Sequence, residues 1–90
     1  MPAVARVGDT ISHDGIIIDG AIISGASRTK VEGKLAARQG DQVLCNKHGL
    51  QVIAGGTSHV LVEGKPVACI GDMISCGAII MSGADSVKVG

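Results

Sequence analysis

The sequence predicts an all-β fold, a small pseudo-threefold prism of short β-hairpin repeats packed around a common axis. One phrase occurs three times, short valine-rich stretches are bounded by Gly, Asp and Ser, and closely spaced glycines disfavour a long helix. A unit with a single hairpin cannot bury an apolar face alone. Three such units around one axis can, and this favours the prism.

The repeated phrase ends in Gly-Asp, with Asp9, Asp41 and Asp72 separated by steps of 32 and 31 residues. Small residues precede each copy: Ala-Val-Ala at 3–5, Leu-Ala-Ala at 35–37 and Pro-Val-Ala at 66–68. A second shared segment runs into Val-Glu-Gly-Lys in the first two units and Val-Lys-Val-Gly in the third. We therefore expect one domain, residues 1–90, made of units at approximately 1–33, 34–64 and 65–90.

Each unit is expected to contain a tight turn between short strands. Glu32-Gly33 and Glu63-Gly64 stand where a hairpin would reverse the chain, because Gly adopts positive φ without strain. Valine-rich stretches at 60–62 and 67–70 are too short for helices and are expected to be strands. The Gly-Asp pairs predict the opposite bends, since an Asp side chain can bond its own downstream backbone.

The apolar composition limits what the core can be. Hydrophobic residues make up 46% of the chain, yet it contains no Phe, Tyr or Trp. The core must therefore use aliphatic side chains packed closely against glycine backbone. We expect residues 16–18 and 78–81 to be core, with exposure for docking as the alternative. A domain this small often needs a disulfide, a metal or a partner as well.

Charge and composition exclude several functions. A net charge of zero and the absence of aromatic rings argue against nucleic-acid binding. No apolar run approaches the roughly 20 residues of a membrane-spanning helix. The N-terminus lacks the apolar stretch of a secretory signal, so we expect synthesis in the cytoplasm without a signal peptide.

The repeat also predicts a metal site. Four residues after the three aspartates stand His13, Cys45 and Cys76, and threefold packing brings equivalent positions together. His48 follows Cys45 at a spacing that lets both side chains bind one metal. Because zinc takes four N or S ligands in tetrahedral geometry, we expect one structural zinc ion to link the units.

Two ligand sets fit this expectation. One consists of His13, His48, His59 and Cys76, and uses every histidine of the chain. The other exchanges His59 for Cys45. Cys69 occupies the position of Arg6 and Arg38 inside a predicted strand, and is expected to be a small buried residue. Three cysteines in a cytoplasmic chain do not predict a disulfide framework.

Catalysis is the weaker hypothesis. A hydrolytic zinc needs an open coordination position and a nearby Glu as base. The only glutamates, Glu32 and Glu63, repeat at the same turn position, which a structural role explains. The sequence therefore predicts a protein that is not an enzyme, with a small zinc-dependent hydrolase as the alternative.

The repeated phrase resembles that of the PAAR-repeat proteins, named for Pro-Ala-Ala-Arg. The closest matches are Leu-Ala-Ala-Arg at 35–38, Ala-Val-Ala-Arg at 3–6 and Pro-Val-Ala-Cys at 66–69. Each of the three is followed by x-Gly-Asp. The Cys-Gly at 76–77 and the Cys-x2-His-Gly at 45–49 fit the family too. No copy spells all four letters, but their order and spacing are preserved over essentially the whole chain.

The resemblance implies a mechanical role. Such proteins form a pointed cone on the trimeric VgrG spike of the bacterial type VI secretion system, or on the equivalent spike of contractile phage tails. One copy would cap each trimer, be exported at the tip of the apparatus, touch the target membrane only transiently and carry effector proteins non-covalently. The family's apical zinc is held by three histidines and one cysteine. The resemblance therefore implies that His13, His48 and His59 are zinc ligands. It implies Cys76 as the fourth ligand, with Cys45 as the next candidate.

Overall fold

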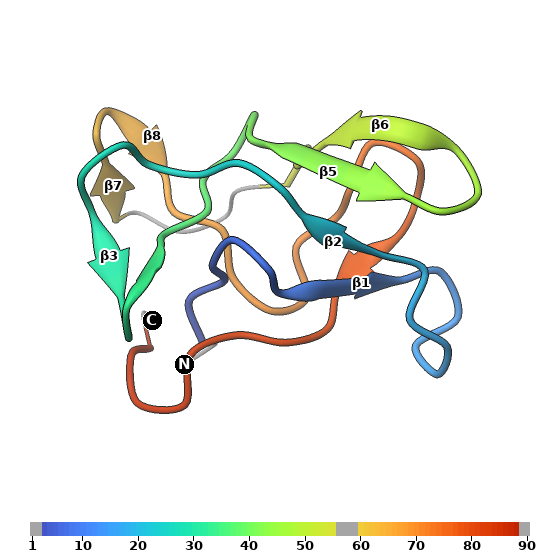
Figure 1. Cartoon of the computed structure of the whole chain (residues 1–90), viewed down its shortest axis with the longest axis horizontal. Coiled ribbons are helices and arrows are strands. Elements are labelled where there is room, and N and C mark those ends of the chain that lie inside the picture. The colour runs from blue at the N-terminus through green and yellow to red at the C-terminus, as the bar shows by residue number, and fades with distance from the viewer. Residues whose placement is uncertain (1–2, 56–59, 89–90) are drawn as a thin grey trace.

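The computed structural model describes residues 3–55 and 60–88, and within them the chain is all-β with no helix. Its strands are short and connected by turns (Figure 1). They are β1 (Thr10–Ser12), β2 (Gly20–Ile22), β3 (Lys30–Val31), β4 (Lys34–Leu35), β5 (Gln42–Cys45), β6 (Gly49–Val52), β7 (Leu61–Val62), β8 (Lys65–Pro66) and β9 (Ile79–Ile80). None of the described segments is a helix long and apolar enough to cross a membrane.

Five of the strands form one sheet in the order β6-β5-β2-β1-β9, and each neighbouring pair is antiparallel. The pairs β3–β4 and β7–β8 form two separate hairpins. Figure 1 shows these hairpins at one end of the molecule, while β1 and β5 run side by side with β2 toward the other end. The first end is called the hairpin end below.

A ring of backbone hydrogen bonds defines the predicted axis. The amide of Ala5 donates to the carbonyl of Ala68, Ala68 donates to Ala37, and Ala37 donates back to Ala5, at 2.8–2.9 Å. These alanines occupy the third position of the three small-residue runs, and all are fully buried. Alanine suits this place because a larger side chain would separate the three backbones. The repeated positions therefore meet around one axis, as a pseudo-threefold fold requires.

The core continues along this axis in layers of equivalent or nearly equivalent residues. Every side chain in these layers is at most 1% exposed, and all belong to one cluster. The layers are Ala5, Ala37 and Ala68; Ile11, Val43 and Ile74; and Ile22, Ile53 and Ile80. Aliphatic side chains of this size fill the narrow centre without any ring, which confirms the predicted composition of the core.

The two predicted hairpin turns are present. Glu32 and Glu63 take φ of 54° and 52°, and the following Gly33 and Gly64 take 82° and 84°. Two successive residues with positive φ form the tight turn that matches strand twist. Here glutamate accepts a conformation that normally favours Asn, Asp or Gly. Hydrogen bonds to its carboxylate, described below, account for that choice.

The Gly-Asp bends form, but through a different bond from the one expected. Each aspartate accepts a hydrogen bond from an upstream amide three residues earlier, not from its downstream backbone. The donors are Arg6 to Asp9 at 2.7 Å, Arg38 to Asp41 at 2.8 Å and Cys69 to Asp72 at 2.9 Å. The preceding glycines all have φ between 90° and 95°, which turns the chain back so that each carboxylate reaches that amide.

The prediction that residues 16–18 are core is wrong. Ile16, Ile17 and Ile18 lie in the loop between β1 and β2 and are 87%, 63% and 61% exposed. The loop extends beyond the ends of β1 and β2 (Figure 1). The second predicted core segment is largely confirmed, because Ala78 and Ile80 are fully buried.

Candidate metal centre

Three of the predicted ligands stand two residues beyond a core residue in each unit. Cys45 ends β5 and shares the face of Val43, because side chains two residues apart point to the same face of a strand. His13 lies in the bend after β1 and Cys76 in a turn. His13 follows the core residue Ile11 by two positions, as Cys45 follows Val43, and Cys76 stands in the same relation to Ile74. The ligands therefore form the next layer along the axis, at the end opposite the hairpins. This end is called the donor end.

The turn between β5 and β6 supplies the fourth side chain. Cys45 pairs with Gly49 across the turn, and His48 lies between them. Gly49 takes φ of 76°, which closes this three-residue loop and directs His48 back toward Cys45. Gly77, with φ of 96°, closes the turn that carries Cys76, and its amide donates to the carbonyl of Ile74 at 2.8 Å.

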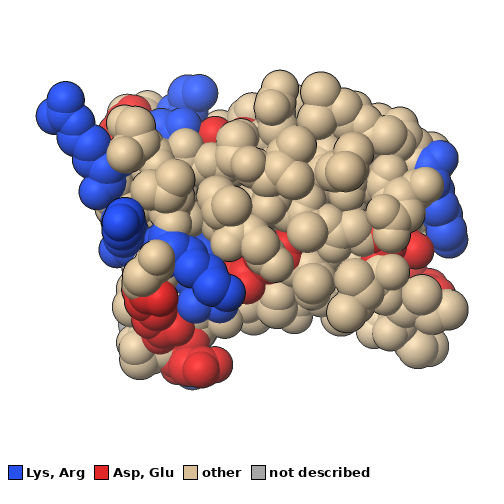
Figure 2. Space-filling model, in the orientation of Figure 1, with Lys and Arg blue, Asp and Glu red and all other residues tan. Residues whose placement is uncertain are grey.

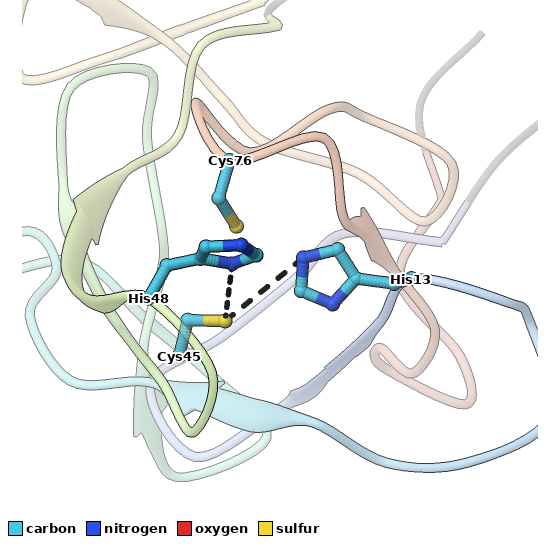
Figure 3. Close-up of side chains that lie close together, drawn as sticks. All are labelled: His13, Cys45, His48 and Cys76. Carbon is cyan, nitrogen blue, oxygen red and sulfur yellow. Dashed lines mark hydrogen bonds between the residues drawn. The ribbon is translucent and has the colours of Figure 1, made fainter.

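Together these residues form a four-donor centre (Figure 3). One ligand atom from each lies within 4.8 Å of all the others, in the set His13, Cys45, His48 and Cys76. Cys45 Sγ lies 3.5 Å from His48 Nδ1 and 4.0 Å from His13 Nε2. Tetrahedral zinc spaces its N and S ligand atoms by roughly 3.3–3.8 Å. The four residues therefore fit a single metal ion after small side-chain movements.

The surroundings of the two sulfurs favour the thiolate form of Cys45 and disfavour that of Cys76. Burial raises the pKa of Cys45, but hydrogen bonds from the Lys47 amide, the His48 side chain and the His48 amide outweigh it and lower that pKa. Burial raises the pKa of Cys76, and the neighbouring Cys45 raises it further. A bound cation would reverse the second effect, since its charge stabilises both thiolates.

Asp19 orients His13 from the side away from the centre. Its Oδ2 accepts hydrogen bonds from His13 Nδ1 and from the His13 amide, both at 2.9 Å. These bonds lower the pKa of Asp19. Because Nδ1 is engaged, His13 presents Nε2 to the other donors, as in the carboxylate–histidine–metal arrangements of many metal sites. Lys47 Nζ lies 3.7 Å from Asp19 Oδ1.

The structure brings together His13, His48 and Cys76 of the first predicted set, with Cys45 as their fourth neighbour. This combination is the second predicted set. His59 lies outside the described residues. Cys69 is buried away from the centre, as expected. The sequence analysis did not identify Asp19, although a carboxylate six residues from a candidate ligand histidine is a usable signal.

The two glutamates lie at the hairpin end and are fully occupied there. Glu63 accepts hydrogen bonds from the amides of Ser27, Arg28 and Thr29. The bonds from the Arg28 amide, and then from the Ser27 hydroxyl and amide, do most to lower its pKa to about 2. Glu32 accepts in the same way from the amides of Asp85 and Ser86. Each carboxylate thus joins its own hairpin to a loop of another unit, and neither is near the four-donor centre.

Arginines complete this arrangement in two of the units. Arg6 Nη1 lies 3.0 Å from Glu32 and Arg38 Nη1 lies 3.8 Å from Glu63, while each guanidinium also bonds the aspartate of its own bend. Figure 2 shows basic and acidic side chains gathered at the hairpin end, with few across the middle of this face. The charged groups therefore act mainly between units at that end.

Comparison with known proteins agrees with the geometry. No curated protein matches the sequence significantly. The family described as "PAAR motif" matches residues 18–82 of the 90-residue chain, which includes three of the four donors and both hairpin turns. This match supports a cone-shaped all-β fold and a structural, spike-tip type of role in secretion systems. The chain therefore belongs to the PAAR-motif family.

Proposed function

We propose that this protein is the zinc-stabilised, non-enzymatic tip of a type VI secretion spike, and that it caps a trimeric VgrG protein. The observation that carries the proposal is the four-donor centre at one end of a single-chain threefold fold. A tip needs rigidity where it is too narrow to contain a hydrophobic core. A metal that joins segments from different units supplies it.

The proposed zinc ligands are His13, Cys45, His48 and Cys76. Zinc prefers this mixture of imidazole and thiolate, and four protein ligands leave no open position for water or substrate. Both glutamates of the chain are held in hydrogen bonds at the hairpin end, so neither is available as a base beside the metal. These features support a structural metal rather than the alternative, a zinc-dependent hydrolase.

The hairpin end is the proposed docking surface for the spike. It carries β3–β4, β7–β8 and the antiparallel pairing of Ala3 with Lys88, which is the third copy of the same two-strand arrangement. Three similar faces around one axis suit a partner with true threefold symmetry, and short unpaired edges can add to its strands. A threefold site accepts one such chain, so the expected ratio is one copy per trimer.

Two further parts of the proposal concern cargo and location. Such a tip would carry effector proteins by non-covalent contact. It would be made in the bacterial cytoplasm and leave the cell with the spike. A phage tail spike would use the same tip chemistry.

The experiment mixes the purified protein with its cognate VgrG trimer and measures the mass of the complex by light scattering after size exclusion. We expect one copy per trimer. Leu61→Asp at the hairpin end should abolish the complex, because Leu61 is 62% exposed on β7. The matched control is Leu50→Asp, since Leu50 is 57% exposed on β6 and should not contact the trimer. No complex, or three copies per trimer, would contradict the proposal.

A further inference from the structure

The loop between β1 and β2 exposes three consecutive isoleucines at the donor end. Ile16, Ile17 and Ile18 are more than half exposed, and Ile16 is the most exposed large apolar residue of the described chain. The loop extends beyond the ends of β1 and β2, so these residues stand on a projecting segment of the chain (Figure 1). Exposed apolar groups that cluster in this way mark an interaction site.

Backbone amides of this loop already have hydrogen-bond partners within the loop itself. Asp14 Oδ1 accepts hydrogen bonds from the amides of Ile16 and Ile17 at 2.8 and 2.9 Å, and the Gly15 amide donates to Ser12 Oγ at 2.9 Å. Three successive amides are therefore satisfied within the loop. That arrangement matters most in hydrocarbon, where no water replaces a lost partner. Gly15, with φ of 80°, permits this tight conformation.

Charges are confined to the base of the loop. Asp14 and Asp19 stand on either side of residues 15–18, and Lys47 is the basic residue beside Asp19. The Asp14 side chain is exposed, whereas Asp19 is only 4% exposed and accepts hydrogen bonds from His13. The other Lys and Arg residues belong to segments of the hairpin end or its flanking bends (Figure 2). The loop is thus an apolar apex above one exposed carboxylate, that of Asp14.

We propose that residues 16–18 insert into the interfacial region of a zwitterionic lipid bilayer, with Asp14 remaining at the level of the headgroups. A convex apolar apex above a charged side chain matches the polarity change across a bilayer surface. The carboxylate of Asp14 gives anionic lipid no attraction, so the apolar contact drives the interaction. The biological meaning rests on the proposed function, which makes the donor end the first part to meet a target membrane.

The test is flotation of the intact protein with phosphatidylcholine vesicles. The loop variant Ile16→Ser/Ile17→Ser/Ile18→Ser should lose at least about tenfold in partitioning, because each isoleucine contributes apolar area that only the membrane buries. Leu50→Ser/Leu61→Ser is the matched control, since both leucines are comparably exposed elsewhere. It should float like the wild type. Raising salt from about 50 to about 500 mM should not weaken the binding.

Four outcomes would overturn this inference. They are no flotation of the wild type, equal loss in the control, binding that requires anionic lipid or low salt, and a dimer in solution that only the loop variant abolishes. The last would mean that a second copy covers the loop. The loop variant should still bind the VgrG trimer with one copy. If vesicle binding fails while that complex forms, only the lipid inference fails. If the trimer is not bound but flotation is lost with the loop, only the proposed function fails.

Discussion

The two ends of this small molecule are held together by different chemistry. At the donor end, the side chains that follow the core are His13, Cys45 and Cys76, with His48 beside them, and they meet within one metal's reach. At the hairpin end, Glu32 and Glu63 join neighbouring units through hydrogen bonds to backbone amides. The hairpin end is joined by carboxylates that accept hydrogen bonds from amides of neighbouring units, whereas the four side chains of the donor end could share one metal ion.

A second difference lies within the hairpin end itself. Arg6 and Arg38 each join an aspartate to a glutamate, but the third unit has Cys69 in their place. Burial raises the pKa of Cys69, and the nearby Asp72 raises it further, so this thiol stays neutral. In the sequence, Gly90 stands at the position of Glu32 and Glu63. Arginine and glutamate are therefore present together in two units and absent together in the third.

Removing the metal should have the largest effect of all. Structural zinc contributes on the order of 10–16 kcal/mol in small zinc-binding peptides, which is comparable to the stability of a whole domain. We expect a strong chelator to lower the Tm by more than about 20 °C, measured by circular dichroism. Adding zinc back should restore it. A Tm that is the same with and without chelator would show that the donor end needs no metal.

Asp19→Asn should weaken metal binding without removing a donor. Asparagine keeps the shape but loses the charge that orients and polarises His13, so we expect an affinity loss of about 10- to 100-fold in a competition titration. Asp85→Asn, an exposed acid at the hairpin end, is the control and should leave the affinity unchanged. Equal metal affinities for Asp19→Asn and the wild type would show that Asp19 does not support metal binding by His13.

Arg38→Ala should cost more stability than Cys69→Ala, although both residues hold the same position in their units. Arg38 makes two side-chain bonds to Asp41 and lies 3.8 Å from Glu63, so its loss leaves a nearly buried carboxylate without its cation. We expect the Tm to fall by about 5–10 °C for Arg38→Ala and by less than about 5 °C for Cys69→Ala. A larger fall in Tm for Cys69→Ala than for Arg38→Ala, measured by thermal unfolding, would contradict this difference between the units.

Glu63→Gln should lower the stability modestly at neutral pH and give a distinct pH dependence. The pKa of Glu63 falls from its ordinary 4.5 to about 2 in the folded protein. Its contribution is therefore complete above about pH 5 and is lost as the pH falls from there toward 2. We expect a Tm about 5 °C lower at pH 7, with the difference from wild type shrinking toward pH 2. A constant difference across that range would contradict the assignment.

The repeat made most of the fold predictable. Its fixed spacing identified the hairpin turns at Glu32 and Glu63, and equivalence around an axis brought His13, Cys45 and Cys76 together. Ile16 to Ile18 were misjudged because composition does not show that the β1–β2 loop extends past the end of the sheet. The role of Asp19 was also beyond the repeat, since the corresponding position in the second unit is Gln51. Such unique contacts depend on the tertiary arrangement.

Metal content combined with X-ray absorption at the metal edge tests the central claim most directly. Two histidines and two cysteines converge in the four-donor centre. We predict one zinc per purified chain, with two sulfur ligands at about 2.3 Å and two nitrogen ligands at about 2.0–2.1 Å. Cys45→Ala should remove one sulfur or the metal itself, whereas His59→Ala should leave the spectrum unchanged. A shell of one sulfur and three nitrogens, or a protein purified without metal, would contradict the account.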